Sequence, residues 1–146
     1  MSDKAKILFI CMGNSCRSQM AEGFARSLRG DVLDPYSAGY EARGLDPYAV
    51  SVMHEVGVDI SRQRSKTLED LGDTAYEYVV TVCGESDESC PVYSGGARVI
   101  HRGFDDPPTL ARHARSDEER LGHYRRVRDE IRAYVLTLPE SLTADR

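Results

Sequence analysis

Short apolar runs alternate with longer stretches in which apolar residues recur every three or four positions. The continuous run at 6–11 predicts a strand that is buried on both faces, and the valine-rich run at 78–82 predicts another. Weaker strand signals lie at 98–101 and at 32–37, where Pro35 favours an edge position. Strands that alternate with helices predict a three-layer α/β fold around a four-stranded parallel sheet.

Amphipathic stretches between the strands predict the helices, which in chain order are 17–29, 47–56, a short segment at 67–71 and a long helix at 116–138. Asp46 can cap the second helix, and Ser116 with Glu119 forms a capping box at the start of the last. No repeat or linker interrupts the pattern, so residues 1–146 are expected to be one domain, with a frayed tail at 140–146.

A polar loop joins the first strand to the first helix, and we call residues 11–18 the anion loop. Its backbone N–H groups and the following helix N-terminus can converge on one tetrahedral oxyanion. The expected oxyanion-binding residues are Met12, Gly13, Asn14, Ser15, Cys16, Arg17 and Ser18. Arg17 can hold two oxygens of the anion in a bidentate fork. Cys11 would lie beneath the anion, where the same field stabilises a thiolate, so it is the predicted nucleophile.

The bare Cys-x5-Arg spacing is a weak signal, because an arginine-rich chain with four cysteines can produce it by chance. The alternative is a buried structural cysteine at the end of a strand. That interpretation leaves Gly13, Arg17 and the polar character of the loop unexplained. Cys16 lies inside the loop, where its amide matters more than its sulfur, and we do not expect it to be essential for redox chemistry.

Other chemical groups follow strands whose carboxyl ends should meet at the same edge of the sheet. Asp106, in the predicted loop 103–108, is the candidate general acid that protonates a leaving oxygen, with Asp105 as the second candidate. The alternative for both is a simple turn, which favours Asp beside Pro.

Cys83 and Cys90 flank a polar loop and suggest thiol–disulfide exchange. If Cys11 carried an oxyanion on its sulfur, Cys83 could attack that sulfur and expel the reduced anion, leaving a transient Cys11–Cys83 disulfide. Cys90 could then attack Cys83, which frees Cys11 and leaves a Cys83–Cys90 disulfide. The alternative is two buried structural thiols.

Composition narrows the function classes. The net charge is −5 and the pI about 5.4, which disfavours nucleic-acid binding. No apolar run is long enough to span a membrane and no signal peptide is recognised, so a cytoplasmic protein with unbridged resting cysteines is expected. The cysteine spacings do not match zinc sites, so neither a metal nor another bound cofactor is predicted. The four histidines are assigned no role.

Five motifs occur together and in a familiar order: Cys11-Met-Gly-Asn-Ser-Cys-Arg-Ser-Gln-Met-Ala-Glu-Gly23, Tyr36-Ser-Ala-Gly39, Val79-Val-Thr-Val-Cys83, Cys90-Pro91 and Gly103-Phe-Asp-Asp-Pro107. Through them, about residues 5–135 resemble the thioredoxin-coupled arsenate reductases. That family shares the fold of the low-molecular-weight protein tyrosine phosphatases.

The resemblance implies a role for each matching residue. Cys11 attacks arsenate while Arg17 and the loop amides hold it, and Asp106 assists the leaving group. Cys83 releases arsenite, Cys90 completes the cascade, and thioredoxin reduces the Cys83–Cys90 disulfide as the external reductant. The resemblance also implies arsenic detoxification, competition by phosphate or sulfate, and a weak phosphatase side activity. We expect a monomer.

Two departures from the family pattern affect these expectations. Relatives that bind potassium use residues matching Asn14, Glu22 and Ser37 and an acidic residue, and that last position falls at Lys66 here. A lysine ammonium could replace the cation, so potassium dependence is not expected. Residues 109–118 are longer than in the shortest members, and we interpret them as a surface loop without a catalytic role.

Three other functions compete with arsenate reduction. A tyrosine or small-molecule phosphatase would use the anion loop and Asp106 but not Cys83 and Cys90, and Pro107-Pro108 replaces the tyrosines that usually shape an aromatic site. A redox sensor or metalloid trap would not need an oxyanion loop. A reductase recycled by a small thiol such as mycothiol would not need both Cys83 and Cys90.

Overall fold

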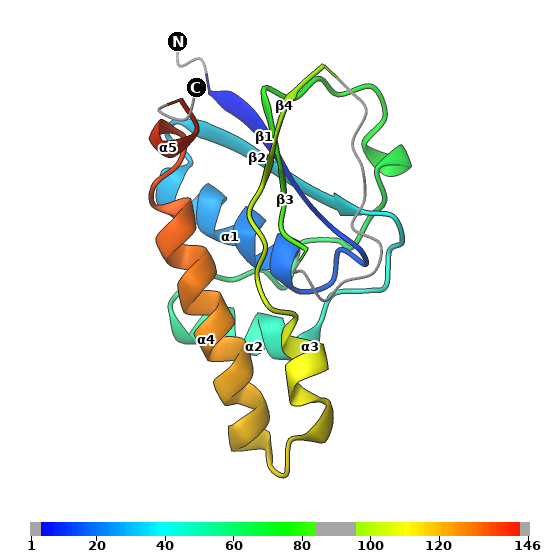
Figure 1. Ribbon diagram of the computed structural model, residues 1–146, viewed down its shortest axis with the longest axis vertical. Helices are drawn as coiled ribbons and strands as arrows, with labels where there is room; N and C mark the ends of the chain where they lie inside the picture. The colour runs from blue at the N-terminus through cyan, green and yellow to red at the C-terminus, as the bar shows by residue number, and fades with distance from the viewer. Residues whose placement is uncertain (1–3, 84–95, 144–146) are drawn as a thin grey trace.

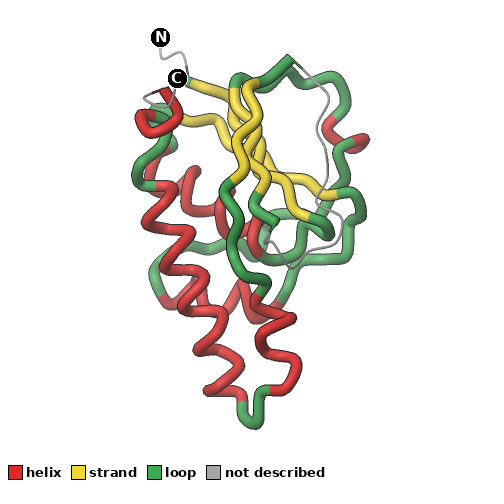
Figure 2. Tube along the Cα trace, in the orientation of Figure 1, coloured by secondary structure: helices red, strands yellow, loops and turns green. Residues whose placement is uncertain are grey.

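A four-stranded parallel sheet is the centre of the protein, as predicted. The computed structural model describes residues 4–83 and 96–143. The strands are β1 (Ala5–Cys11), β2 (Leu33–Gly39), β3 (Tyr78–Thr81) and β4 (Arg98–His101). They lie in the order β2-β1-β3-β4, and all three pairings are parallel. The predicted edge position of β2 is confirmed (Figures 1 and 2).

Strand β1 is central, and its apolar run explains why. Residues 7–10 are completely buried. Their side chains alternate across the sheet, so Ile7 and Phe9 join one core cluster while Leu8 and Ile10 join the other. A strand buried on both faces needs such a continuous run. The cysteine that ends this strand is therefore fixed by a rigid, fully packed element.

Helices cover the sheet and include two long ones. The α-helices are α1 (Arg17–Arg29), α2 (Pro47–Glu55), α3 (Pro107–Leu110), α4 (Asp117–Val135) and α5 (Glu140–Thr143), and short 3-10 helices are η1 (Glu69–Leu71) and η2 (Ala111–His113). Helices α1 and α4 pack against each other on one side of the sheet (Figure 1). On the other side, Leu68 and Leu71 around η1 pack against Leu8 and Ile10.

Capping residues fix where two helices begin. Asp46 caps α2 by accepting a hydrogen bond from the Tyr48 N–H at 2.9 Å. Ser116 caps α4 by accepting from the Glu119 N–H at 3.1 Å. In a regular capping box, the Glu119 carboxylate would accept a hydrogen bond from the N–H of Ser116. It accepts one from the N–H of Arg115 instead, so the capping box is displaced by one residue.

Two predictions about loops are wrong. Part of the loop predicted at 103–108, and most of the stretch predicted as a surface loop at 109–118, is folded into α3, η2 and the start of α4. Pro107 and Pro108 occupy the first turn of α3, where a missing N–H costs nothing.

The prediction of a frayed tail is wrong for residues 140–143, because they form α5 and Leu142 is 3% exposed. The apolar contact of Leu142 with the core holds this segment.

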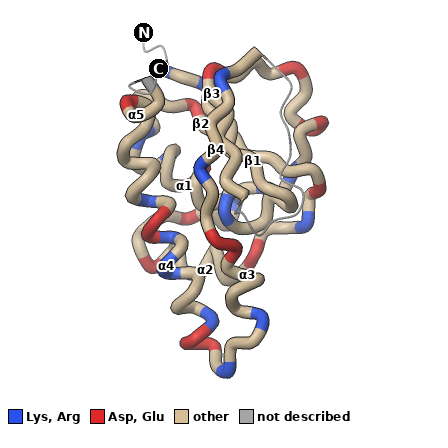
Figure 3. The backbone as a smooth tube through the Cα atoms, viewed as in Figure 1, with Lys and Arg blue, Asp and Glu red and all other residues tan. Residues whose placement is uncertain are grey.

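Acidic and basic residues are interspersed along α4 (Figure 3). An arginine-rich run such as 125–128 is usually a solvated helix face, but Arg128 does not fit that pattern. Its side chain is buried, and its guanidinium donates to the Val52 carbonyl at 3.0 Å and to Glu55 at 2.8 Å. A buried arginine is tolerated here because a carboxylate and a carbonyl accept its hydrogen bonds.

None of the helices among the described residues is both long and apolar enough to cross a bilayer.

Gly39 at the end of β2 is required by close packing against the anion loop. A Cβ there would lie 2.6 Å from the Met12 carbonyl oxygen and 2.9 Å from both the Asn14 nitrogen and the Cys11 carbonyl oxygen. Because these are backbone atoms, a side chain at position 39 would force the loop to move. We expect Gly39→Ala to lower the free energy of unfolding by about 1–3 kcal/mol, measured by chemical denaturation.

Gly122→Ala is the matched control, because a Cβ at this position of α4 would meet no atom within 4 Å in the described part of the chain. It should leave stability unchanged or raise it by up to about 1 kcal/mol, since alanine favours helices. Equal effects of the two substitutions would contradict the packing of Gly39 against the loop.

Candidate active site

Asn14 shapes the anion loop between β1 and α1. Its φ is +47°, a left-handed conformation that asparagine tolerates better than most residues. The buried side chain donates to the Ser18 hydroxyl at 2.8 Å and accepts from the Gln19 amide and the Lys66 N–H, both at 2.8 Å. The first turn of α1 and the segment around Lys66 are thereby tied to the bend of the loop.

Cys11 lies at the start of this loop, at the carboxyl end of β1. It is 3% exposed, and its sulfur is 2.9 Å from the Ser18 hydroxyl oxygen. Cys16 stands at the N-cap of α1 and, among the described residues, no side chain caps that helix. The first amides of α1 can donate to an anion at the same end of the loop.

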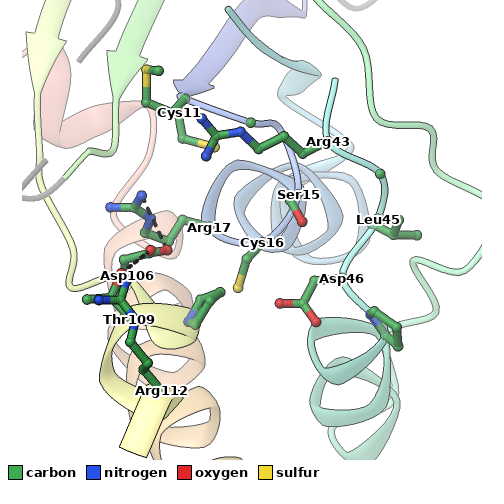
Figure 4. A pocket seen from close by; sticks show the side chains of 15 residues that line it. Cys11, Ser15, Cys16, Arg17, Arg43, Leu45, Asp46, Asp106, Thr109 and Arg112 are labelled. Atoms are coloured by element: carbon green, nitrogen blue, oxygen red, sulfur yellow. Dashed lines mark hydrogen bonds and ion pairs between the residues drawn. The ribbon is translucent and has the colours of Figure 1, made fainter. Parts of the chain in front are cut away.

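The anion loop forms the floor of an open cavity of about 830 Å³. Its lining includes Cys11, Met12, Gly13, Ser15, Cys16 and Arg17 from the loop, Arg43, Asp46 and Pro47 from the segment entering α2, and Asp106, Pro108, Thr109 and Arg112 around α3 (Figure 4). The nucleophile and the arginine of the anion loop thus meet the acid, which was predicted from a distant stretch, in one cavity.

Arg17 links the anion loop to the segment that carries the acid. Its side chain is buried, and its guanidinium donates to the Phe104 carbonyl at 3.0 Å. The same guanidinium lies 3.4 Å from the Asp106 carboxylate. The arginine is therefore oriented before an anion arrives, which reduces the entropy lost on binding.

The structure separates the two candidate acids. Asp106 has a 24% exposed side chain and lines the cavity beside Arg17. The side chain of Asp105 is 59% exposed and pairs with Arg126 of α4 at 2.9 Å. Asp105 is not among the described residues that line the cavity. The geometry therefore favours Asp106 as the general acid, a choice that the sequence left open.

Cys16 lines the cavity but is held as a thiol. Burial raises its pKa well above the usual value, and the nearby carboxylates of Asp46 and Asp106 raise it further. The thiol is therefore a poor nucleophile at neutral pH. This agrees with the expectation that the amide of Cys16, and not its sulfur, serves the loop.

Cys83 follows β3, the strand beside β1. The Val82 N–H donates to the Ile10 carbonyl at 2.9 Å, so this pairing extends almost to Cys11 and Cys83. Cys83 is completely buried and is not one of the described residues that line the cavity. Cys90, and with it the predicted Cys83–Cys90 disulfide, lies outside the described residues.

Lys66 occupies the position that the sequence suggested for a replaced cation. The Ser37 hydroxyl donates to Glu22 at 2.5 Å, and the Lys66 ammonium lies 3.5 Å from each of these two side-chain oxygens. Arg26 also pairs with Glu22, at 2.7 Å. Within residues 4–83 and 96–143, no three His, Cys, Asp or Glu side chains are grouped as a metal site would require.

Sequence reasoning missed one polar contact beside the cavity. Asp46 was recognised only as a helix cap, but it also accepts a hydrogen bond from the Tyr124 hydroxyl at 2.7 Å, and its N–H donates to the Ser15 carbonyl at 3.0 Å. Burial and this carboxylate raise the pKa of Tyr124, so its phenol stays protonated. Asp46 therefore connects the anion loop, α2 and α4.

The chain matches the family described as low molecular weight phosphotyrosine protein phosphatase over residues 6–146. An arsenate reductase of Halalkalibacterium halodurans is 45% identical over 139 residues, which cover 95% of this chain and 98% of that protein. A solved structure described as an arsenate reductase in the phosphate binding state superposes with a TM-score of 0.73 at 33% identity, covering 92% of this chain and 95% of that one. A thioredoxin-dependent arsenate reductase from Corynebacterium glutamicum superposes with a TM-score of 0.65 at 26% identity, covering 98% of this chain and 64% of that one.

Alkylation should distinguish the two cysteines of the anion loop. At about pH 7, iodoacetamide should label Cys11 while Cys16 stays unlabelled, because burial raises the pKa of the Cys16 thiol. Tandem mass spectrometry of the peptide that contains both residues gives the site. Excess phosphate should slow the labelling of Cys11 by occupying the loop. Labelling of Cys16 as fast as that of Cys11 would contradict this assignment.

Potassium should not stabilise the protein, because the Lys66 ammonium already lies against Glu22 and Ser37. We expect equal Tm values in potassium chloride and in choline chloride of the same concentration. Lys66→Ala should lower the Tm and should make it rise with potassium, since the oxygens of Glu22 and Ser37 then lack the ammonium. Lys4→Ala, at an exposed position, is the control. A wild-type Tm that rises specifically with potassium would refute this interpretation.

Proposed function

The chain belongs to the low-molecular-weight phosphotyrosine protein phosphatase family, and we propose that within this family it is an arsenate reductase. The observation that carries the proposal is the shared cavity of Cys11, Arg17 and Asp106. Nucleophilic attack on a tetrahedral oxyanion requires a nucleophile, a guanidinium that holds two oxygens of the anion, and a proton donor. The arsenate reductases among the chain's relatives support the choice of oxyanion.

Arsenate binds in the anion loop in this proposal. The loop amides and the first amides of α1 donate to its oxygens, and Arg17 holds two of them. Phosphate and sulfate have the same tetrahedral shape and similar charge, so they compete for the loop. The solved relative described as being in the phosphate binding state agrees with this competition.

The first chemical step forms a bond between the Cys11 sulfur and arsenic(V). The Cys11 thiolate attacks the arsenic, one As–O bond breaks, and Asp106 gives its proton to the departing oxygen, which leaves as water. Ser18, at 2.9 Å from the sulfur, can donate a hydrogen bond that stabilises the thiolate before attack. No electrons have yet reached the arsenic.

Reduction follows when a second thiolate attacks. The sulfur of Cys83 attacks the sulfur of Cys11, the S–As bond breaks, and its electron pair stays on the arsenic. Arsenic(V) becomes arsenic(III) and leaves as arsenite, while the two sulfurs are oxidised to a Cys11–Cys83 disulfide. The neighbouring ends of β1 and β3 support this pairing.

Cys90 and thioredoxin complete the proposed cycle. Cys90 attacks Cys83, which returns the Cys11 thiolate and leaves a Cys83–Cys90 disulfide. Thioredoxin then supplies two electrons and two protons, so no bound cofactor is needed. The family resemblance and a thioredoxin-dependent relative support this reductant. The spacing of two cysteines across a polar segment also fits an internal cascade.

Phosphate-ester hydrolysis is the second candidate function, as a weak side activity. The cavity of about 830 Å³ is far larger than one tetrahedral oxyanion and can admit an ester group. Hydrolysis would use Cys11, Arg17 and Asp106 in the same first step. Water would then attack the phosphorus, break its bond to the Cys11 sulfur and release phosphate and the Cys11 thiolate. It would leave all cysteines reduced.

Cysteine variants separate the two activities. We expect Cys11→Ser to abolish both arsenate reduction and p-nitrophenyl phosphate hydrolysis. Cys83→Ser and Cys90→Ser should abolish thioredoxin-coupled, multiple-turnover arsenate reduction, measured as NADPH oxidation with thioredoxin reductase. The same two variants should hydrolyse p-nitrophenyl phosphate at the wild-type rate, which controls for folding of the anion loop.

Normal thioredoxin-coupled turnover by Cys83→Ser would refute the cascade. A wild-type protein that hydrolyses the aryl phosphate but never reduces arsenate would be a phosphatase.

A further inference from the structure

Thr109 holds one oxygen of the Asp106 carboxylate, and we infer that it is a positioning residue for the general acid. The inference rests on the proposed function, because it assumes that Asp106 donates a proton there. Thr109 lies in the stretch that we expected to have no catalytic role. Its hydroxyl donates to the Asp106 Oδ2 at 2.7 Å. Both residues line the cavity above the anion loop (Figure 4).

The two prolines after Asp106 reduce the number of backbone donors that its carboxylate could use at the start of α3. Asp106 is the N-cap of α3, where a carboxylate usually accepts backbone N–H groups of the first turn. Pro107 and Pro108 have no N–H, and no backbone N–H of α3 caps the Asp106 side chain. The nearest hydroxyl along the helix, that of Thr109, serves instead.

A hydroxyl differs from a backbone N–H in a way that suits an acid. An N–H group can only donate, so it favours the ionised carboxylate. The Thr109 hydroxyl can donate to the carboxylate and can also rotate to accept a hydrogen bond from the protonated acid. Asp106 therefore keeps a hydrogen-bond partner in both protonation states of its catalytic cycle.

The contact also orients the acid. With Oδ2 held by Thr109, the other oxygen, Oδ1, lies 3.4 Å from the Arg17 guanidinium. Arg17 binds the oxyanion in the proposed mechanism, so this orientation directs one carboxyl oxygen to the side where the leaving oxygen departs. Without Thr109, the carboxyl group could rotate, and a smaller fraction of encounters would have the proton in place.

The test compares Thr109→Val, which removes the hydroxyl at nearly constant shape, with Thr109→Ser, which keeps it. The measured quantity is the single-turnover rate of thiol loss after arsenate is added to reduced protein. Thr109→Val should lower the maximal rate about 5- to 10-fold and change the half-saturating arsenate concentration less than about 2-fold. Thr109→Ser should restore the rate to within about 2-fold of wild type.

A double-mutant cycle tests whether Thr109 acts through Asp106. In an Asp106→Asn background, Thr109→Val should lower the rate no further, because no acid is left to position. An equal loss in both backgrounds would overturn the inference and indicate a general structural role. A Thr109→Val rate within about 2-fold of wild type would also overturn it.

Failure of the proposed function gives a different result. If wild-type protein loses no thiols with arsenate, the reductase proposal fails, and the same five proteins are then compared in p-nitrophenyl phosphate hydrolysis. The positioning role predicts the same order of rates there, since the acid protonates a phenolate leaving group. Equal hydrolysis rates for wild type and Thr109→Val would overturn it.

Discussion

The left-handed bend at Asn14 is the constraint on which the rest of the site depends. Backbone amides can surround an anion only if the loop curves tightly, and φ of +47° at Asn14 supplies that curve. Such a conformation costs free energy, and hydrogen bonds to Ser18, Gln19 and Lys66 offset that cost. Gly39 must be small because β2 runs against the same loop.

Arg17 extends this preorganisation from the loop to the acid. A lone buried guanidinium would be costly, but the Phe104 carbonyl and the Asp106 carboxylate satisfy it. A guanidinium, a carboxyl group and a cysteine sulfur therefore line one cavity. When an oxyanion enters, Arg17 can bind it and still hold the segment that carries Asp106. In the proposed mechanism, oxyanion binding and proton donation are therefore coupled through one side chain.

Local patterns predicted much of this arrangement. The apolar run of β1, the period of α1 and the Cys11–Arg17 spacing are contained in consecutive residues, so the sequence alone indicated them. The burial of Arg128 depends on how α4 packs against α2, which is distant in sequence. The contact of Thr109 with Asp106 depends on the short helix α3, which begins with two prolines. Neither contact produces a periodic pattern in the sequence. The choice of Asp106 over Asp105 likewise required Arg126 of α4, which is remote in sequence.

A thiol titration tests most directly whether this loop performs redox chemistry. Fully reduced protein is freed of reductant, mixed with excess arsenate or with phosphate, quenched, unfolded and titrated for free thiols. We expect arsenate, but not phosphate, to remove two thiols per chain and to yield one arsenite, and we expect peptide mapping to find Cys83 joined to Cys90. Survival of all four thiols with arsenate would contradict it.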